Sequence, residues 1–327
     1  MTGGRSGETL LERHDALLVD LDGVVYRGAQ AVPHAVEALN AAARGGTTLA
    51  FVTNNAARPP TAVAEHLTEL GLAVADHDVV TSAQAGAREV SALVPPGSTV
   101  LAVGGPGVAL ALEACGLVPV ASAADAPAAV LMGFGPDVSW RQLAEAAYAV
   151  GAGAVFVATN TDASIPTARG IAPGNGTLVG AVQAATGRAP VVAGKPYAPL
   201  MRESVERVDA RRPLVVGDRL DTDIEAGHVS GIPSLLVLTG VTGVEALLAA
   251  AAHQRPTYLA ADLRGLALPV AAVQVEPTAA EHPDVDGLAP LRAACRAAWS
   301  AADRGAPTPP RDLPALEEAV ARALRRA

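Results

Sequence analysis

The stretch Ala16-Leu17-Leu18-Val19-Asp20-Leu21-Asp22-Gly23 decides the fold. Its four apolar residues show no polar alternation, which predicts a short strand buried on both faces, as in a parallel sheet covered by helices. The strand stops at an acidic turn that contains glycine. Because ligands bind outside the carboxyl ends of the strands in open α/β sheets, this turn is a candidate functional site.

Three further apolar runs stop in the same way. They are Thr48–Val52 before Thr53-Asn54-Asn55, Val191–Ala193 before Gly194-Lys195, and Pro213–Val216 before Gly217-Asp218. Helical patterns follow the four runs, at Pro33–Arg44, Thr61–Leu70, Pro199–Val208 and Thr222–Val229. This alternation predicts an α/β fold with a doubly wound, Rossmann-like parallel sheet. We therefore expect polar groups from all four strand ends to meet at one edge of that sheet.

A long insertion separates the second run from the third. It has strand patterns at Thr99–Val103, Ala128–Met132 and Ala154–Thr159, and helical patterns at Val108–Ala114, Ser139–Val150 and Gly180–Thr186. We expect a discontinuous core, 1–82 plus 190–275, an inserted α/β cap domain, 83–189, and a helical C-terminal extension, 276–327. Two helical stretches of the extension, Leu288–Asp303 and Leu313–Arg326, either pack back on the core or mediate association.

The composition excludes several classes of protein. The 327 residues include 24 Lys+Arg against 33 Asp+Glu, a net charge of −9, which argues against a nucleic-acid partner and an anionic membrane surface. No uncharged apolar stretch reaches the roughly 18 residues of a membrane span, and the N-terminus has no apolar signal core. The two cysteines, Cys115 and Cys295, lack disulfide or zinc spacing, so a reducing cytoplasm is expected.

The acidic pair Asp20 and Asp22 predicts a cation site. Two carboxylates so close repel each other unless a cation or a shared proton intervenes. A hard ion with oxygen ligands, such as Mg²⁺, fits them best. The alternative is that Asp22 only forms the turn before Gly23.

A second acidic cluster follows the strand pattern at Pro213–Val216. Asp218 comes directly after the strand and is the better metal ligand, whereas Asp221 or Thr222 is the better helix cap. Asp223 is placed to hydrogen-bond metal-bound water. The sequence leaves open which of Asp221 and Asp223 assists the metal.

The remaining strand ends carry groups that bind anions. Thr53-Asn54 offers a hydroxyl and a backbone N–H, although the same residues commonly form turns. Lys195 is the only lysine among the 24 basic residues. In a chain that otherwise uses arginine, a lone lysine indicates a position that needs a compact ammonium group.

These motifs resemble, in order, the four motifs of the haloacid dehalogenase (HAD) superfamily of phosphohydrolases. Asp20-Leu21-Asp22-Gly23-Val24 is similar to the first motif, Thr53-Asn54 to the second, Lys195 to the third and Gly217-Asp218 through Asp223 to the fourth. The stretches DGVVYRG, VTNNAAR, PGNGTLV, GKP and GDRLDTDI further resemble the p-nitrophenyl phosphatase-like subgroup, which has a large C2-type α/β cap. The tail beyond residue 275 resembles those of actinobacterial glycerol-3-phosphate phosphatases.

The resemblance implies a role for each motif. Asp20 would be the nucleophile that forms an aspartyl-phosphate, and Asp22 the general acid and base. Mg²⁺ would be held by Asp20, the backbone carbonyl of Asp22 and Asp218, with Asp223 behind them. The phosphoryl oxygens would be held by Thr53, Asn54 and Lys195.

The resemblance also implies a cap that closes over a small phosphate ester. The loop Asn160–Arg169 is expected to read the leaving group, with Asn55, Ile165 and Arg169 as candidate substrate-binding residues. Pyridoxal-phosphate-type relatives have a histidine where Ile165 stands, which argues against that substrate. The implied enzyme is an Mg²⁺-dependent phosphatase for glycerol 3-phosphate. Phosphoglycolate, pyridoxal phosphate, sugar phosphate and nucleoside monophosphate are alternatives, and a homodimer is left open.

Three rival functions differ in class. A phosphorylated receiver domain would be much shorter and has no place for the insertion. A nucleotide-binding module is suggested by Val103-Gly104-Gly105-Pro106-Gly107, but Leu110 stands where the dinucleotide fingerprint needs its third glycine. A catalytically silent phospho-ligand-binding module would be expected to lack a nucleophile or a metal ligand, and every such residue is present here.

Overall fold

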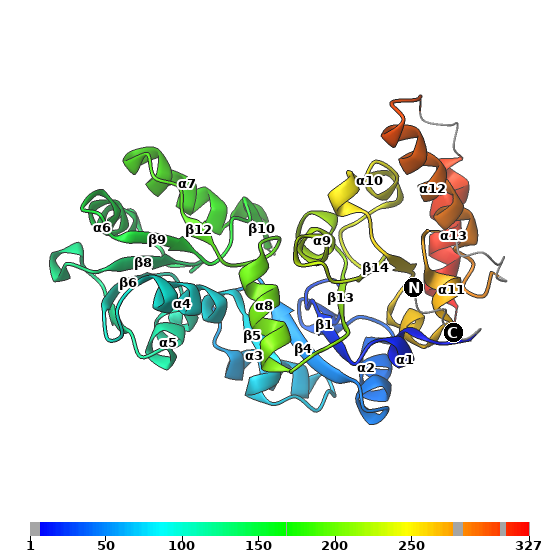
Figure 1. The fold of residues 1–327 in the computed structure, drawn as a ribbon, viewed down its shortest axis with the longest axis horizontal. Coiled ribbons are helices and arrows are strands. Elements are labelled where there is room, and N and C mark those ends of the chain that lie inside the picture. Colours follow the sequence, from blue (N-terminus) through cyan, green and yellow to red (C-terminus); the bar gives the residue numbers. More distant parts are fainter. Residues whose placement is uncertain (1–6, 168, 277–283, 308–311, 327) are drawn as a thin grey trace. The chain divides into compact units, whose positions relative to one another are not determined.

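The computed structural model describes residues 7–167, 169–276, 284–307 and 312–326 (Figure 1). The chain divides into two compact units. The first comprises Met1–Phe51, Leu67–Ala73 and Val205–Ala327, and the second comprises Val52–His66 and Val74–Ser204. Both contain parallel strands flanked by helices, which confirms the predicted α/β class. The predicted boundaries of core, cap and extension stay a prediction.

The first unit is built on parallel strands in the order β15-β14-β13-β1-β4. Their bounds are β1 Ala16–Val19, β4 Thr48–Thr53, β13 Pro213–Gly217, β14 Ser234–Val237 and β15 Tyr258–Ala260. Every residue of β1 is buried, as its apolar run predicts. Val19 lies opposite Phe51 on one side and Val216 on the other, so β1, β4 and β13 end at the same edge. A small antiparallel hairpin, β2 Tyr26–Arg27 and β3 Gln30–Ala31, follows β1.

The other elements of the first unit are helical. They are α1 Leu10–Arg13, α2 Ala35–Arg44, α9 Glu225–Ser230, α10 Val244–Leu248, α11 Val270–Val273, α12 Ala289–Asp303 and α13 Leu313–Arg325. Strand β4 contains residues of both units, since its last two residues, Val52 and Thr53, belong to the second. Two longer helices, α3 Pro60–Glu69 and α8 Ala198–Arg207, also contain residues of both units. Among the described residues, no helix has the length and apolar character needed to cross a membrane.

The C-terminal helices α12 and α13 pack back on the first unit, one of the two expected outcomes. Leu291, Cys295 and Trp299 of α12 belong to the same buried cluster as Leu236 and Leu259 of the sheet. The indole N–H of Trp299 donates to the carbonyl oxygen of Leu247 at 3.0 Å. The polar edge of this indole is therefore satisfied while its ring is buried, as large interior aromatics require.

The second unit has a sheet of its own, with the order β12-β9-β8-β6-β7. The strands and helices of this unit are β5 Val79–Thr81, α4 Ser82–Leu93, β6 Thr99–Val103, α5 Pro106–Ala114, β7 Val118–Val120, β8 Ala129–Met132, α6 Trp140–Gly151, β9 Val155–Ala158, β10 Ser164–Thr167, β11 Gly170–Pro173, α7 Asn175–Thr186 and β12 Val191–Val192. Helices α4 and α5 cover one face of the sheet, and α6 and α7 cover the other (Figure 1). Successive residues of β8 alternate between the two apolar clusters, with Leu131 in one and Val130 in the other. Both faces are therefore buried, as in a doubly wound sheet.

Two expectations about this unit were wrong. The run Val191–Ala193 was expected to end at the same sheet edge as the other three runs, but β12 pairs with β9 in the second sheet. A strand of two residues with an exposed Val191 is an edge strand, and so short a run carries no information about its partner. The helix expected at Gly180–Thr186 begins five positions earlier, at Asn175, because Gly174 has the extended conformation of an N-cap.

Candidate active site

Three carboxylates form a cluster at the carboxyl end of the first sheet. Asp20 directly follows β1, Asp218 directly follows β13, and Asp223 lies one turn further on. Each offers an oxygen within 4.8 Å of the oxygens of the other two. Asp218 and Asp223 are buried and Asp20 is half-buried. We call Asp20, Asp218 and Asp223 the acid cluster.

Backbone pairing places two members of the acid cluster side by side. Val19 and Val216 are opposite each other in the parallel ladder, and the N–H of Asp20 donates to the carbonyl oxygen of Val216 at 2.8 Å. The residues that follow these strands therefore leave the sheet together. Asp22 lies on the exposed side of the next turn, while Leu21 between the two acids is buried. Burial of Leu21 anchors the acidic segment to the core.

The loop between β14 and α10 holds Asp218 in place. The N–H of Val241 donates to Oδ2 of Asp218 at 2.6 Å, and the N–H of Thr242 donates to its carbonyl oxygen at 3.2 Å. The hydroxyl of Thr239 donates to the carbonyl oxygen of Gly23 at 2.6 Å, which ties the same loop to the first acidic turn. Hydrogen bonds from backbone N–H groups to a carboxylate are among the stronger ones in proteins.

Three glycines leave the space that the acid cluster occupies. A Cβ on Gly23 would lie 2.7 Å from Oδ2 of Asp218, and Gly23 also has a φ of +85°. A Cβ on Gly240 would overlap the carboxylate of Asp218, and one on Gly217 would overlap that of Asp223. Glycine is therefore required here by close approach of the side chains, and at Gly23 also by the backbone conformation.

Sequence reasoning missed the loop Thr239–Thr242. The sequence does carry a signal for it, because the apolar run of β14 stops at a polar residue and a glycine, Thr239-Gly240, like the other strand ends. Its contacts with Asp218 come from backbone N–H groups, and the missing side chain of Gly240 leaves space for the carboxylate. Backbone N–H groups and a glycine are not revealed by the pattern of acidic, basic and hydroxyl side chains in the sequence.

The acidic segment after β13 corrects the expected helix cap. The chain forms one π-helical turn, Leu220–Ile224, before α9 begins at Glu225, and neither element has a side-chain cap. The assignment of Asp221 or Thr222 as the cap was therefore wrong. Asp221 instead accepts two hydrogen bonds from the guanidinium of Arg219, at 3.0 and 2.8 Å, and these lower the pKa of the Asp221 carboxyl.

The π-helical turn also places Asp221 and Asp223 in different surroundings, which the sequence did not predict. Asp221 is exposed and paired with Arg219, whereas Asp223 lies in the acid cluster. Oδ2 of Asp223 accepts the N–H of Arg219 at 3.1 Å. The extra residue of a π-helical turn moves Asp223 relative to its place in a regular helix, and such turns are frequent at functional sites.

The acid cluster fits a hard divalent cation. All three members supply carboxylate oxygens, which such ions prefer, and three like charges at this distance repel unless a cation compensates them.

The second unit contains the other predicted motif residues. The hydroxyl oxygen of Thr53 accepts the N–H of Asn55 at 3.0 Å, and Oδ1 of Asn55 accepts the N–H of Ala57 at 2.9 Å. Lys195 is 3% exposed, and its ammonium donates to the carbonyl oxygen of Val52 at 3.3 Å. This lone lysine is thus a buried cation beside the second motif.

The side chain of Asn54 joins the second and third motifs. Its Oδ1 accepts the N–H of Lys195 at 2.8 Å, and its Nδ2 donates to the carbonyl oxygen of Lys195 at 3.1 Å. Nδ2 also donates to Oδ2 of Asp162 at 3.1 Å, and the carbonyl oxygen of Asn54 accepts Nδ2 of Asn160 at 2.7 Å. We call Asn54, Asn160, Asp162 and Lys195 the amide network. Sequence reasoning missed Asp162, because its partner is more than a hundred positions away.

Two of the three candidate substrate-binding residues, Ile165 and Arg169, lie on the β10–β11 hairpin, whereas Asn55 follows β4. Ile165 is half-buried in β10, opposite Ala172, and Arg169 is exposed at the turn, where its N–H donates to the hydroxyl of Thr167 at 3.2 Å. Ala168 lies outside the described residues.

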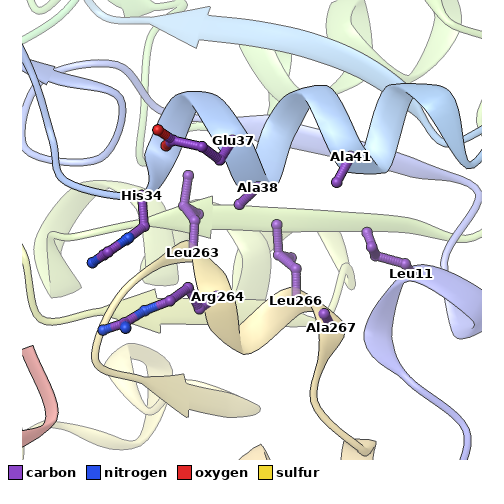
Figure 2. Close-up of a pocket in the computed structure, with 9 residues that line it drawn as sticks. All are labelled: Leu11, His34, Glu37, Ala38, Ala41, Leu263, Arg264, Leu266 and Ala267. Atoms are coloured by element: carbon purple, nitrogen blue, oxygen red, sulfur yellow. The ribbon is translucent and has the colours of Figure 1, made fainter. Parts of the chain in front are cut away.

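A cavity of about 300 Å³ in the first unit contains none of these residues. It lies between α2 and the helical turn Leu263–Ala267 (Figure 2). Its lining is mostly apolar, with His34, Glu37 and Arg264 toward one end (Figure 2). The guanidinium of Arg264 is already paired with Asp262, so this cavity does not resemble a phosphate site.

Comparison with known proteins places the chain in a family. The family model described as haloacid dehalogenase-like hydrolase matches residues 17–118, and a HAD-hydrolase-like model matches residues 192–266. D-glycerol 3-phosphate phosphatase of Mycobacterium tuberculosis is 42% identical over 98% of this chain and 95% of that protein. The chain belongs to the haloacid dehalogenase-like hydrolases.

Solved structures of this family share the fold over most of the chain. A glycerol phosphate phosphatase from Mycobacterium tuberculosis, crystallised in complex with magnesium, superposes with a TM-score of 0.84 at 43% identity and covers 90% of this chain and 92% of that one. A p-nitrophenyl phosphatase from Archaeoglobus fulgidus gives a TM-score of 0.72 at 30% identity and covers 78% of this chain and 98% of that one. The predicted resemblance to this family is thus confirmed.

Proposed function

We propose that this hydrolase is an Mg²⁺-dependent phosphatase that acts on a small phosphate monoester, glycerol 3-phosphate. The acid cluster carries the proposal, because a carboxylate at the end of β1 beside two further carboxylates can serve as a nucleophile next to a cation site. The similarity to D-glycerol 3-phosphate phosphatase over nearly the whole chain supports the choice of substrate.

The reaction has two displacements at phosphorus. A carboxylate oxygen of Asp20 attacks the phosphorus, and the bond to the leaving alkoxide breaks while Asp22 donates a proton to it. A water molecule then attacks the aspartyl-phosphate, Asp22 takes its proton, and inorganic phosphate leaves. A general acid–base residue of this kind contributes about 10²–10⁴-fold to the rate.

The remaining residues bind the ion and the phosphoryl group. We propose that Asp20, the backbone carbonyl of Asp22 and Asp218 hold Mg²⁺, with Asp223 orienting water on it. Bound Mg²⁺ supplies positive charge that offsets the repulsion between the anionic nucleophile and the anionic ester. Thr53, the backbone N–H of Asn54 and the ammonium of Lys195 hold the phosphoryl oxygens. Asn55, Ile165 and Arg169 contact the rest of the substrate.

The test is phosphate release across a panel of esters. Glycerol 3-phosphate, phosphoglycolate, pyridoxal phosphate, a sugar phosphate, nucleoside monophosphates and an aryl phosphate are compared with and without Mg²⁺. We expect the highest kcat/KM for glycerol 3-phosphate, and loss of turnover on chelation and in Asp20→Asn. A higher kcat/KM for another ester would make that ester the substrate in place of glycerol 3-phosphate. Failure to hydrolyse any ester would favour the phospho-ligand-binding alternative.

A cytoplasmic location and a homodimer are further proposals. The two cysteines, Cys115 and Cys295, lack disulfide spacing in the sequence, which supports a reducing compartment. Fractionation of the native host and sedimentation of the purified chain test the two proposals separately.

A further inference from the structure

The carboxamide of Asn54 has a single satisfactory orientation. Its two Nδ2 protons have two acceptors, the carbonyl oxygen of Lys195 and Oδ2 of Asp162, and its Oδ1 accepts the N–H of Lys195. Rotating the amide by half a turn would bring Oδ1 against the carboxylate of Asp162 and Nδ2 against an N–H donor. The carboxylate of Asp162 therefore favours this orientation together with the two backbone groups of Lys195.

The orientation of Asn54 in turn holds the backbone of Lys195. Two hydrogen bonds, at 2.8 and 3.1 Å, join the carboxamide to the N–H and the carbonyl of this one residue. Lys195 is 3% exposed, so water has little access to its backbone groups and cannot readily replace these two hydrogen bonds. A Cβ on Gly194, the preceding residue, would lie 2.7 Å from Oδ1 of Asn54, so glycine is needed for this close approach.

The first turn of α7 holds the segment that carries Asp162. The N–H of Gly176 donates to the carbonyl oxygen of Asp162 at 2.9 Å, and the N–H of Gly174 donates to that of Ala163 at 2.9 Å. A Cβ on Gly174 would overlap the carbonyl oxygen of Asp162, and one on Gly176 would overlap that of Thr161. These contacts account for the two glycines, Gly174 and Gly176, of the PGNGTLV stretch at 173–179. The proposed chemistry does not use these glycines.

We infer that Asp162 is a positioning residue that fixes the phosphate-binding lysine through the Asn54 carboxamide. The inference rests on the proposed function, in which Lys195 holds the phosphoryl group. Asp162 also begins the segment that leads to the β10–β11 hairpin, so one carboxylate joins the expected substrate-reading loop to the phosphate-binding motif. This connection requires no contact between Asp162 and substrate.

The activity test compares Asp162→Ala with Asp162→Asn and a matched surface variant, Asp137→Asn. Asp137 is an exposed carboxylate of the same unit outside the amide network. We expect Asp162→Ala to lower kcat/KM by about 10²-fold, mainly through kcat, because a misplaced charge fails to stabilise the transition state. Asp162→Asn can still accept one hydrogen bond and should lose less than about tenfold. Equal activity of Asp162→Ala and Asp137→Asn would overturn the inference.

A second test observes Lys195 directly and requires no turnover. Because Lys195 is the only lysine, ¹⁵N-lysine labelling gives one backbone amide resonance. In Asp162→Ala we expect this resonance to shift and its hydrogen exchange to accelerate, while Asp137→Asn leaves both unchanged. If Asp162→Ala does not fold, Asp162→Asn is measured instead. At equal stability, we expect the backbone amide of Lys195 to exchange a few-fold faster in Asp162→Asn than in the wild-type chain. Unchanged exchange would contradict the inference. A wild-type chain that hydrolyses no ester would overturn the proposed function, and this spectrum would still judge Asp162.

Discussion

The polar groups of the acid cluster and those of the amide network are held in place by different kinds of contact. In the acid cluster, the described contacts that hold Asp218 come from backbone N–H groups, and three glycines provide the space. In the amide network, Asn54 is held by another side chain, Asp162, and holds a backbone in turn. The first arrangement depends on the path of the main chain, and the second on the identity of side chains.

This difference predicts how each region responds to mutation. A site shaped by main-chain geometry should fail when a single methyl group is added, because close-packed interiors have no spare volume. A site held by side-chain hydrogen bonds should tolerate a replacement of the same shape and fail when the hydrogen-bonding group is removed.

The largest effect is expected for Gly240→Ala. The new Cβ would overlap the carboxylate of Asp218, so kcat/KM should fall by about 10²-fold or more. The matched control is Gly243→Ala in the same loop, where a Cβ has no atom within 4 Å and φ is −88°. Steady-state kinetics with Mg²⁺ compare the two. Equal activity of both variants would show that the glycines do not shape the acid cluster.

A smaller effect is expected for Asp223→Asn. Removal of this charge should weaken Mg²⁺ affinity by about 10–100-fold, the usual range for groups that support metal ligands. Asp221→Asn, two positions away, should leave the affinity within about twofold, because an exposed pair such as Arg219–Asp221 contributes little. Mg²⁺ titration of the activity measures both. The reverse ranking would mean that the π-helical turn does not select Asp223.

A third variant, Gly174→Ala, tests the amide network through its support. The added Cβ would overlap the carbonyl oxygen of Asp162, so kcat/KM should fall by about tenfold and the free energy of unfolding by about 1–3 kcal/mol. Gly180→Ala, inside α7, has no atom within 4 Å of its Cβ and should raise helix stability by up to about 1 kcal/mol. Urea unfolding and kinetics are read together. An unchanged activity in Gly174→Ala would show that the first turn of α7 does not support the amide network.

The smallest effect concerns His14, just before β1 and at the opposite end of the strand from Asp20. Burial lowers the pKa of His14 below its ordinary value of 6.5, and Nε2 has no hydrogen-bond partner among the described residues. The folded state therefore binds fewer protons than the unfolded state, so stability is full above about pH 6.5 and falls as the pH drops toward the folded pKa. Urea unfolding at pH 5.5 and 7.5 gives the difference in the free energy of unfolding between the two pH values. His14→Gln should reduce this difference. An unchanged difference would place the acid sensitivity elsewhere.

Much of the acid cluster could be predicted from the sequence. Apolar runs that stop at Asp20 and Asp218 indicate strand ends, and parallel strands end at a common edge. The choice between Asp221 and Asp223 could not be predicted, because it depends on one π-helical turn and on the position of Arg219. The loop at Gly240 holds Asp218 through backbone N–H groups, which every residue type except proline possesses, so no particular side chain marks it.

Less of the amide network could be predicted. The scarcity of lysine pointed to Lys195, but a two-residue strand does not reveal its neighbours, and β12 belongs to the second sheet. The link from Asn54 to Asp162 joins positions far apart in the chain, and such tertiary contacts leave no periodic pattern in a single sequence.

The most direct test of the proposed mechanism is the chemical state of Asp20 during turnover. The reaction with glycerol 3-phosphate and Mg²⁺ is stopped with acid within one turnover, and the digested chain is mapped by mass spectrometry. We predict a phosphoryl group on the peptide that contains Asp20, absent from Asp20→Asn and without ester. Turnover with no phosphoryl group on Asp20, or with one on another residue, would contradict the assignment of the nucleophile.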